Sequence, residues 1–159
     1  MNQRIQYAIE NTRVTAAAYA PFVLRISMAI VYKYFGTSQL RIPESFIGWL
    51  PPEVALLPIS ARSFVILNGA FETFCGLLLL FGIFSRTCAL LLGGHLLGIT
   101  YTIGWTEIGV RDLGLSLATL TIVLLGSGPL GVDDLYQGPR RGSLGEQVSA
   151  TNQPQQQRP

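Results

Sequence analysis

The chain has 159 residues, of which 49% are hydrophobic and 13% are charged, and its formal net charge is +2. Soluble domains carry roughly 25% charged residues, so this composition excludes an ordinary soluble domain and indicates a membrane protein. The small net charge and the lack of a basic patch exclude a nucleic-acid partner, and the length suits one compact unit.

Residues 1–15 are predicted to form a cytoplasmic segment in front of the first membrane span. They carry Arg4, Glu10 and Arg13, and a long apolar stretch follows them. No small-residue cleavage site closes a short apolar core, as it does in a cleaved signal peptide. We therefore expect the first apolar segment to remain in the membrane.

Four segments are apolar over the roughly 20 residues that a helix needs to cross about 30 Å of hydrocarbon. They are predicted at about 16–38, 61–84, 87–105 and 111–128. Four such runs leave no polar faces to cover a soluble bundle. The sequence therefore predicts an all-α fold, a polytopic four-helix membrane bundle within residues 16–132.

The connections between these segments set the expected topology. Residues 39–60 form a proline-rich loop, in which residues 46–50 (Phe-Ile-Gly-Trp-Leu) are expected at the membrane interface. Lysine and arginine are enriched in cytoplasmic loops, and their distribution here predicts cytoplasmic termini and an extracytoplasmic loop in a cell-membrane protein. Residues 133–159 are a polar tail, which we expect to be disordered because it cannot bury enough apolar surface to fold.

Three ionisable residues, Arg25, Glu72 and His95, fall near the middle of three different predicted spans. A charge at this depth costs roughly 2.5–3.5 kcal/mol on insertion scales, so such residues face the helix interior and find partners there. We expect an Arg25–Glu72 ion pair. Asn68 precedes Glu72 by one turn on the same helix face, and Asn68 and His95 would complete the hydrogen bonds.

A second polar layer is predicted nearer the outer surface. It contains Lys33, Arg111 and Asp112, with Lys33–Asp112 as the expected pair and Arg62 and Glu107 as contributors at the rim. A helix N-terminus favours a carboxylate such as Asp112. Two stacked polar layers favour a ligand-binding or proton-relay role over one that only fixes helix register. The candidate residues are Arg25, Lys33, Asn68, Glu72, His95, Arg111 and Asp112.

The remaining residue patterns point to packing. Cys75 and Cys88 lie in apolar runs, at depths that make a disulfide doubtful, and are interpreted as apolar fillers. With one histidine and no CxxC motif, no metal site is predicted. Small residues spaced four apart, Gly94 with Gly98 and Gly114 with Ala118, are expected to let helices approach closely.

Four short patterns, in order, resemble the DoxX family of membrane proteins over about residues 20–130. They are Leu24-Arg25 with Tyr34-Phe35-Gly36 and Ser38-Gln39-Leu40; Asn68-Gly69-Ala70-Phe71-Glu72 leading into residues 76–82; Ser85-Arg86-Thr87-Cys88-Ala89-Leu90; and Arg111-Asp112-Leu113-Gly114. The resemblance implies a four-helix membrane bundle. It also implies that Arg25, Glu72, Arg86 and Asp112 are the family's typical polar residues, whereas Gln39 stands where many members have lysine.

Some members of this family resemble the membrane subunit of a thiosulfate:quinone oxidoreductase. The resemblance therefore implies a redox-linked subunit that holds a quinone, has no covalently bound cofactor, and works with a soluble or membrane oxidoreductase partner. Two alternatives stay open: a binder or transporter of a small molecule or lipid, and a membrane scaffold without catalysis. Homo-oligomerisation and catalysis within this chain are open as well.

Overall fold

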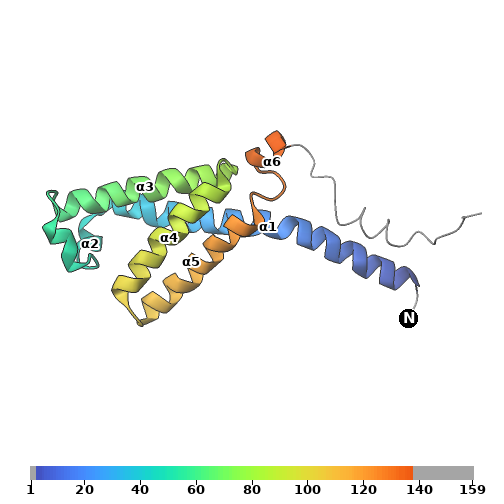
Figure 1. Cartoon of the computed structure of the whole chain (residues 1–159), viewed down its shortest axis with the longest axis horizontal. Coiled ribbons are helices and arrows are strands. Elements are labelled where there is room, and N and C mark those ends of the chain that lie inside the picture. Colours follow the sequence, from blue (N-terminus) through green and yellow to red (C-terminus); the bar gives the residue numbers. More distant parts are fainter. Residues whose placement is uncertain (1–2, 138–159) are drawn as a thin grey trace, which may run out of the picture.

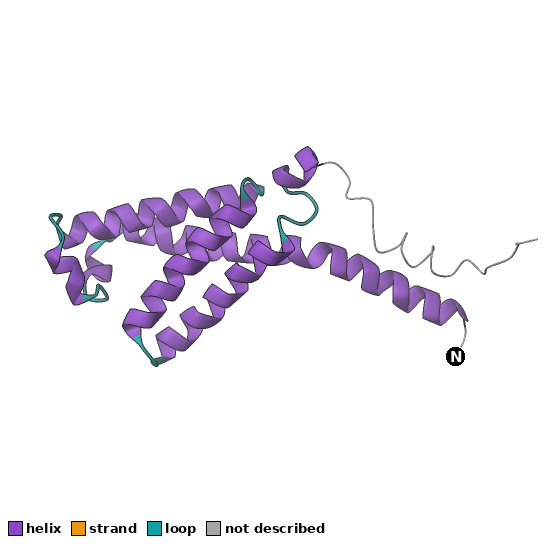
Figure 2. Cartoon of the chain, viewed as in Figure 1, coloured by secondary structure: helices purple, strands orange, loops and turns teal. Residues whose placement is uncertain are grey.

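The computed structural model describes residues 3–137, and every regular element within that range is a helix (Figures 1 and 2). The long helices are α1 (Gln3–Arg41), α3 (Ala61–Phe81), α4 (Ser85–Ile103) and α5 (Glu107–Leu125). The short elements are α2 (Glu44–Ile47), the 3-10 helix η1 (Pro52–Leu56) and α6 (Val132–Gln137). The predicted all-α fold is confirmed.

Three of these helices, α1, α3 and α5, are long and apolar enough to cross a membrane. The helices α3, α4 and α5 begin and end within four residues of the predicted segments. Local caps set their true ends: the side chain of Ser60 accepts from Ser63 N at the start of α3, and that of Thr106 accepts from Gly109 N at the start of α5. Gly82 ends α3 in the left-handed conformation.

The first helix differs most from the prediction, because α1 begins at Gln3 rather than near residue 16. Residues 4–20 are all exposed, and this part of α1 projects beyond the other helices (Figure 1). Contact with the rest of the chain begins near Phe22, where a Cβ at Gly128 would lie 2.7 Å from Phe22 N. The packed part of α1 therefore starts later than the predicted span.

The long helices pack mainly in two pairs, α1 with α3 and α4 with α5. The first pair crosses at two glycines. A Cβ on Gly36 would lie 2.8 Å from the carbonyl oxygen of Gly69, and a Cβ on Gly69 would lie 2.8 Å from that of Gly36. No side chain fits at either position, so these glycines let the two backbones touch.

The glycines that the sequence singled out do not make such contacts. A Cβ at Gly94, Gly98 or Gly114 would have no atom within 4 Å. The prediction that these residues bring helices together is therefore wrong within the described chain. A four-residue spacing of small residues cannot reveal which helix face meets a neighbour, and here the close contact falls on Gly36 and Gly69 instead.

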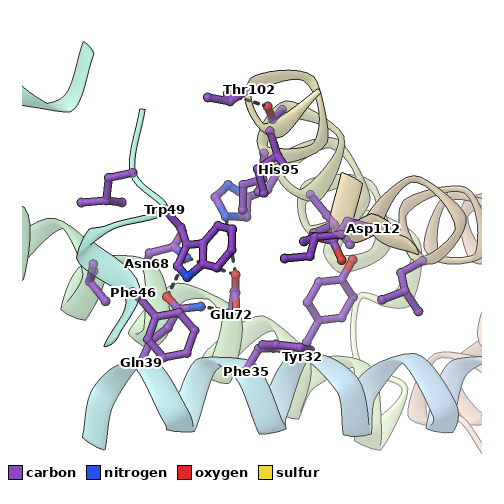
Figure 3. A pocket seen from close by; sticks show the side chains of 18 of the residues that line it. Tyr32, Phe35, Gln39, Phe46, Trp49, Asn68, Glu72, His95, Thr102 and Asp112 are labelled. Carbon is purple, nitrogen blue, oxygen red and sulfur yellow. Dashed lines mark hydrogen bonds and ion pairs between the residues drawn. The ribbon is translucent and has the colours of Figure 1, made fainter. Parts of the chain in front are cut away.

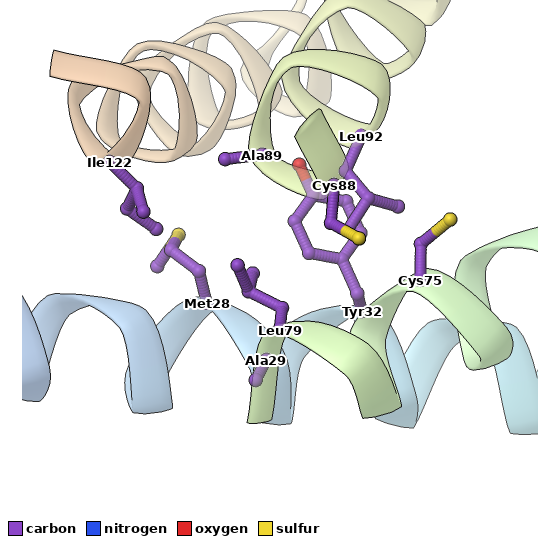
Figure 4. Close-up of a cluster of buried hydrophobic side chains, with 9 residues drawn as sticks. All are labelled: Met28, Ala29, Tyr32, Cys75, Leu79, Cys88, Ala89, Leu92 and Ile122. Atoms are coloured by element: carbon purple, nitrogen blue, oxygen red, sulfur yellow. The ribbon is translucent and has the colours of Figure 1, made fainter. Parts of the chain in front are cut away.

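A buried apolar cluster joins the two helix pairs (Figure 4). It contains Met28, Ala29, Tyr32, Cys75, Leu79, Cys88, Ala89, Leu92 and Ile122. Both cysteines are free and buried, in agreement with their interpretation as apolar fillers. Two hydrogen bonds reinforce the packing: the hydroxyls of Tyr32 and Thr119 lie 3.1 Å apart, and Ser116 Oγ donates to Gly93 O over 2.8 Å.

The chain after α5 folds back onto the start of α4. The carboxylate of Asp133 accepts hydrogen bonds from Phe84 N (2.9 Å) and Ser85 N (2.7 Å), which satisfies two backbone groups at this helix end. The tail predicted to be disordered starts at residue 133, yet residues 133–137 belong to α6. The remainder of that prediction, residues 138–159, lies outside the described residues.

Candidate functional site

A cavity of about 570 Å³ lies between the two helix pairs (Figure 3). Small-molecule sites typically measure about 300–1,000 Å³ and combine apolar walls with a few polar groups. The polar or charged residues that line this cavity include Gln39, Asn68, Glu72, His95, Thr102, Arg111 and Asp112. Its aromatic wall consists of Tyr32, Phe35, Phe46, Trp49 and Phe64.

Glu72 is the centre of a hydrogen-bonded group that links α1 and α3, and His95 of α4 lies beside it. Gln39 Nε2 donates to Glu72 Oε2 over 2.9 Å, and Asn68 Nδ2 donates to Glu72 Oε1 over 3.1 Å. Asn68 Nδ2 also donates to Gln39 Oε1 over 2.7 Å. Together with His95 these residues are called the Glu72 cluster.

His95 points its ring toward the carboxylate of Glu72 from across the cavity (Figure 3). The distance from His95 Nε2 to Glu72 Oε1 is 3.7 Å, which is beyond hydrogen-bond range. This nitrogen is buried and has no hydrogen-bond partner in the described part of the chain. The edge of the ring meets Phe71, with centroids 5.4 Å apart. A residue that lines the cavity thus has a buried ring nitrogen without a hydrogen-bond partner in the described chain.

The predicted Arg25–Glu72 pair is wrong. The guanidinium of Arg25 donates from Nε to Ser127 O over 2.9 Å, from Nη1 to Leu79 O over 2.7 Å, and to the carbonyl of Leu80. These three carbonyls belong to the end of α3 and to the segment after α5. Arg25 and its carbonyl partners, called the Arg25 anchor, lie outside the cavity.

The register of the helices explains this error. The helices α1 and α3 are antiparallel, with Gly36 opposite Gly69 and Arg25 opposite Leu79. Eleven residues separate Arg25 from Gly36, and a rise of about 1.5 Å per residue makes that about 16 Å along the helix. The prediction measured depth from residue 16, whereas the packed part of α1 begins near Phe22.

The predicted Lys33–Asp112 pair is also wrong. Asp112 Oδ1 lies 2.8 Å from Nη2 of its neighbour Arg111, and Arg111 Nε donates to the same oxygen over 2.9 Å. Lys33 is exposed and does not line the cavity, whereas the adjacent Tyr32 does. Consecutive helix residues are rotated by about 100°. Because Tyr32 faces the cavity, Lys33 faces away from it.

The two residues predicted at the rim, Arg62 and Glu107, do not belong to the site either. Arg62 Nε donates to Glu44 Oε1 over 2.9 Å, and this hydrogen bond lowers the pKa of the Glu44 carboxyl from its ordinary value. Neither Arg62 nor Glu107 lines the cavity. The rim of the site is formed instead by Phe46, Trp49 and the neighbouring loop residues, and by the start of α5.

Three features of the site are visible only in the structure. Gln39 was noted only as a departure from a family pattern, although Tyr32, Phe35 and Gln39 follow the spacing of one helix face. Phe46 and Trp49, which are expected at the membrane interface, also contribute to the cavity wall. Gly94 and Gly98 line the cavity, so their missing side chains help to create its space.

A family model described as DoxX matches residues 20–105. The chain belongs to the DoxX family. The match begins close to the packed part of α1 and ends just after α4, so it includes every member of the Glu72 cluster. The resemblance recognised in the sequence is thereby confirmed, although α5, with Arg111 and Asp112, lies beyond the DoxX match. No curated protein matches the chain, and no solved structure matches it.

Proposed function

We propose that this DoxX-family chain binds a quinone in the cavity and acts as the membrane subunit of a redox system with a partner oxidoreductase. The observation that carries the proposal is the buried His95 Nε2, which has no hydrogen-bond partner in the described chain. A neutral imidazole N–H donates a hydrogen bond, and a quinone carbonyl accepts one. The cavity volume and the aromatic residues Phe35, Phe46 and Trp49 suit a flat ring beside this donor.

The residues around His95 have separate roles in this proposal. A bound quinone would accept two electrons from the partner and two protons to become a quinol. Glu72 Oε1 lies 3.7 Å from His95 Nε2 and can hold or release a proton beside the ring. Gln39 and Asn68 fix this carboxylate through their amide hydrogen bonds. Asp112 is held by Arg111, so Glu72 is the better placed proton carrier.

The proposal includes four membrane crossings, with both termini in the cytoplasm. Tyr32 of α1 meets Thr119 of α5, and Arg25 meets Ser127 just beyond α5, so α1 and α5 are antiparallel. Since α1 and α3 are antiparallel too, α3 and α5 run in the same direction. In this proposal the intervening α4, with 19 residues, returns across the same thickness, although it is less apolar than the three candidate spans. Reporter fusions after residues 58, 84, 105 and 137 test this: the first and third should report outside, the others inside.

Quinone content is the direct test of the ligand. The protein is purified from native membranes, extracted with solvent, and then titrated with a short-chain quinone in nanodiscs. The His95→Phe variant removes the proposed donor, and we expect quinone binding to weaken about tenfold, the loss of one hydrogen bond in a buried site. Equal binding by wild type and His95→Phe contradicts the role of this nitrogen.

A pair of glycine variants controls for the location of the ligand. Gly98 lines the cavity and Gly114 does not, and a Cβ at either position meets no atom within 4 Å. Gly98→Leu fills the cavity and should abolish quinone binding, whereas Gly114→Leu should leave it unchanged. Loss of binding in both variants, or in neither, means that the quinone does not occupy this cavity.

The partner is tested by activity in membranes. The resemblance favours a sulfur or thiol oxidoreductase, which would supply electrons that this chain passes to quinone. Membranes from cells lacking the chain should lose thiosulfate- or thiol-dependent quinone reduction, and wild-type protein should restore it while His95→Phe does not. Unchanged reduction in the deletion strain argues against a redox role and favours the binder or transporter alternative.

A further inference from the structure

Glu72 is a buried carboxylate without a fixed cation. It is 4% exposed and is the twelfth of the 21 residues of α3, close to the middle of a helix that can cross a membrane. Its hydrogen-bond donors are the neutral amides of Gln39 and Asn68. Amide donors stabilise a carboxylate but do not neutralise its charge, and an isolated charge at this depth costs several kcal/mol.

The nearby basic groups are committed elsewhere. Arg111 is paired with Asp112, Arg25 donates to three carbonyls outside the cavity, and Lys33 faces away from it. Within residues 3–137, the only basic side chain within 4 Å of the Glu72 carboxylate is the imidazole of His95. No lysine or arginine of the described chain therefore lies beside the Glu72 carboxylate.

The walls around this carboxylate favour a positive ligand. Five aromatic residues line the cavity, from α1, the connecting segment and α3: Tyr32, Phe35, Phe46, Trp49 and Phe64. Aromatic faces attract organic cations electrostatically, and most strongly when the site is shielded from water. A carboxylate within an aromatic cavity therefore provides both parts of a site for an ammonium or phosphonium group.

We infer that the cavity binds lipophilic organic cations, with Glu72 holding the positive charge and the aromatic wall surrounding the apolar substituents. This inference goes beyond the proposed redox function, since it requires neither electron transfer nor a partner. It also explains why an uncharged side chain at position 39 matters for the site. A lysine at this position would place an ammonium beside Glu72 Oε2, where Gln39 Nε2 now donates over 2.9 Å, and would take the place of the ligand's charge.

The test uses tetraphenylphosphonium as the probe and triphenylphosphine oxide as an uncharged compound of similar shape. Both are titrated into wild-type protein in nanodiscs, with empty nanodiscs subtracted. We expect tetraphenylphosphonium to bind at least about tenfold more tightly than the oxide. Only the cation is attracted electrostatically by the carboxylate and by the faces of the aromatic rings. Equal binding of both compounds, or no binding of the cation, overturns the inference.

Two substitutions remove the charge in different ways. Glu72→Gln deletes it, and Gln39→Lys neutralises it while keeping Glu72, so each should weaken tetraphenylphosphonium binding at least about tenfold. Gly114→Leu, outside the cavity, is the matched control and should bind as wild type does. Melting temperatures identify variants that fail to fold. If a folded Gln39→Lys or Glu72→Gln protein binds the cation like wild type, the inference is wrong.

The two proposals can fail separately. A wild-type protein that binds tetraphenylphosphonium but no quinone refutes the redox function and leaves the cation site intact. A protein that binds quinone through His95 and discriminates poorly between the cation and the oxide retains the redox function and loses the cation site.

Discussion

The Arg25 anchor and the Glu72 cluster each hold a buried ionisable residue, but their surroundings differ. Arg25 has three carbonyl acceptors on two segments of the chain, and its guanidinium lies 5.4 Å from the ring centroid of Phe22. Glu72 has two amide donors, a histidine nitrogen at 3.7 Å, and a cavity in front of it.

The two residues therefore differ in how completely the chain satisfies their surroundings. Arg25 uses its donors on backbone carbonyls at the end of α3 and just after α5, so it fastens α1 to both segments. The Glu72 cluster leaves His95 Nε2 without a partner, although it is buried. Burial alone does not distinguish the two residues; the cavity and the unpaired nitrogen beside Glu72 do.

The largest expected effect is on stability, from Arg25→Met. The substitution removes the Arg25 donor from the carbonyls of Leu80 and Ser127, whereas Leu79 O still accepts from Gly82 N, and each buried unsatisfied group costs about 1–3 kcal/mol. We expect the free energy of unfolding to fall by about 3 kcal/mol or more, measured by denaturant titration in detergent. Arg41→Met, at an exposed position, serves as control. If both variants unfold alike, Arg25 is not an anchor.

The next largest effect is the expected difference in stability between two glycine-to-leucine variants. Gly69→Leu inserts atoms where the backbones of α1 and α3 touch, and overpacking of this kind typically costs about 1–3 kcal/mol. Gly98→Leu extends into the cavity, where its Cβ meets nothing, so its unfolding free energy should stay within about 0.5 kcal/mol of wild type. Equal destabilisation of the two variants means that the cavity is not open space.

A smaller stability effect is expected from Glu72→Gln. The glutamine side chain keeps one oxygen as an acceptor for the amides and removes a charge from the middle of α3. The free energy of unfolding should therefore change by less than about 1 kcal/mol, in either direction. A loss as large as that of Arg25→Met would make Glu72 a structural residue and end the distinction between the two sites.

The smallest effect is expected at the exposed Glu44–Arg62 pair. The hydrogen bond from Arg62 lowers the pKa of Glu44 in the folded protein, so its stabilising contribution is present above the unfolded pKa. That contribution disappears as the pH falls through the folded pKa. The melting temperatures of wild type and Glu44→Gln should thus differ slightly at neutral pH and converge in acid. Since salt screens exposed pairs, high salt should also reduce the difference. A difference that persists in acid excludes this ion pair as its source.

Much of the fold was predictable because hydropathy and helix length are local properties. The approximate extents of α3, α4 and α5 follow from their apolar runs, and side-chain caps fix the starts of α3 and α5. The polar candidates were also found in part, since Asn68, Glu72 and His95 lie together.

What the sequence did not reveal depends on how the helices meet. The partner of Arg25 depends on where α1 begins to pack against the other helices, near Phe22. The apolar run starts before Phe22, so the sequence does not show where this packing begins. The direction of Lys33 follows from the rotation of α1, which the buried Tyr32 determines. Gln39 was overlooked because an uncharged residue near a helix end gives no signal until Glu72 is found opposite it.

The length of α1 has a consequence of its own. Residues 3–20 continue the helix beyond its last contacts, and 18 residues at about 1.5 Å each make a rod of about 27 Å. Its side chains from residue 4 to residue 20 are exposed on all sides, so this stretch of α1 is helical without being covered by the other helices (Figure 1).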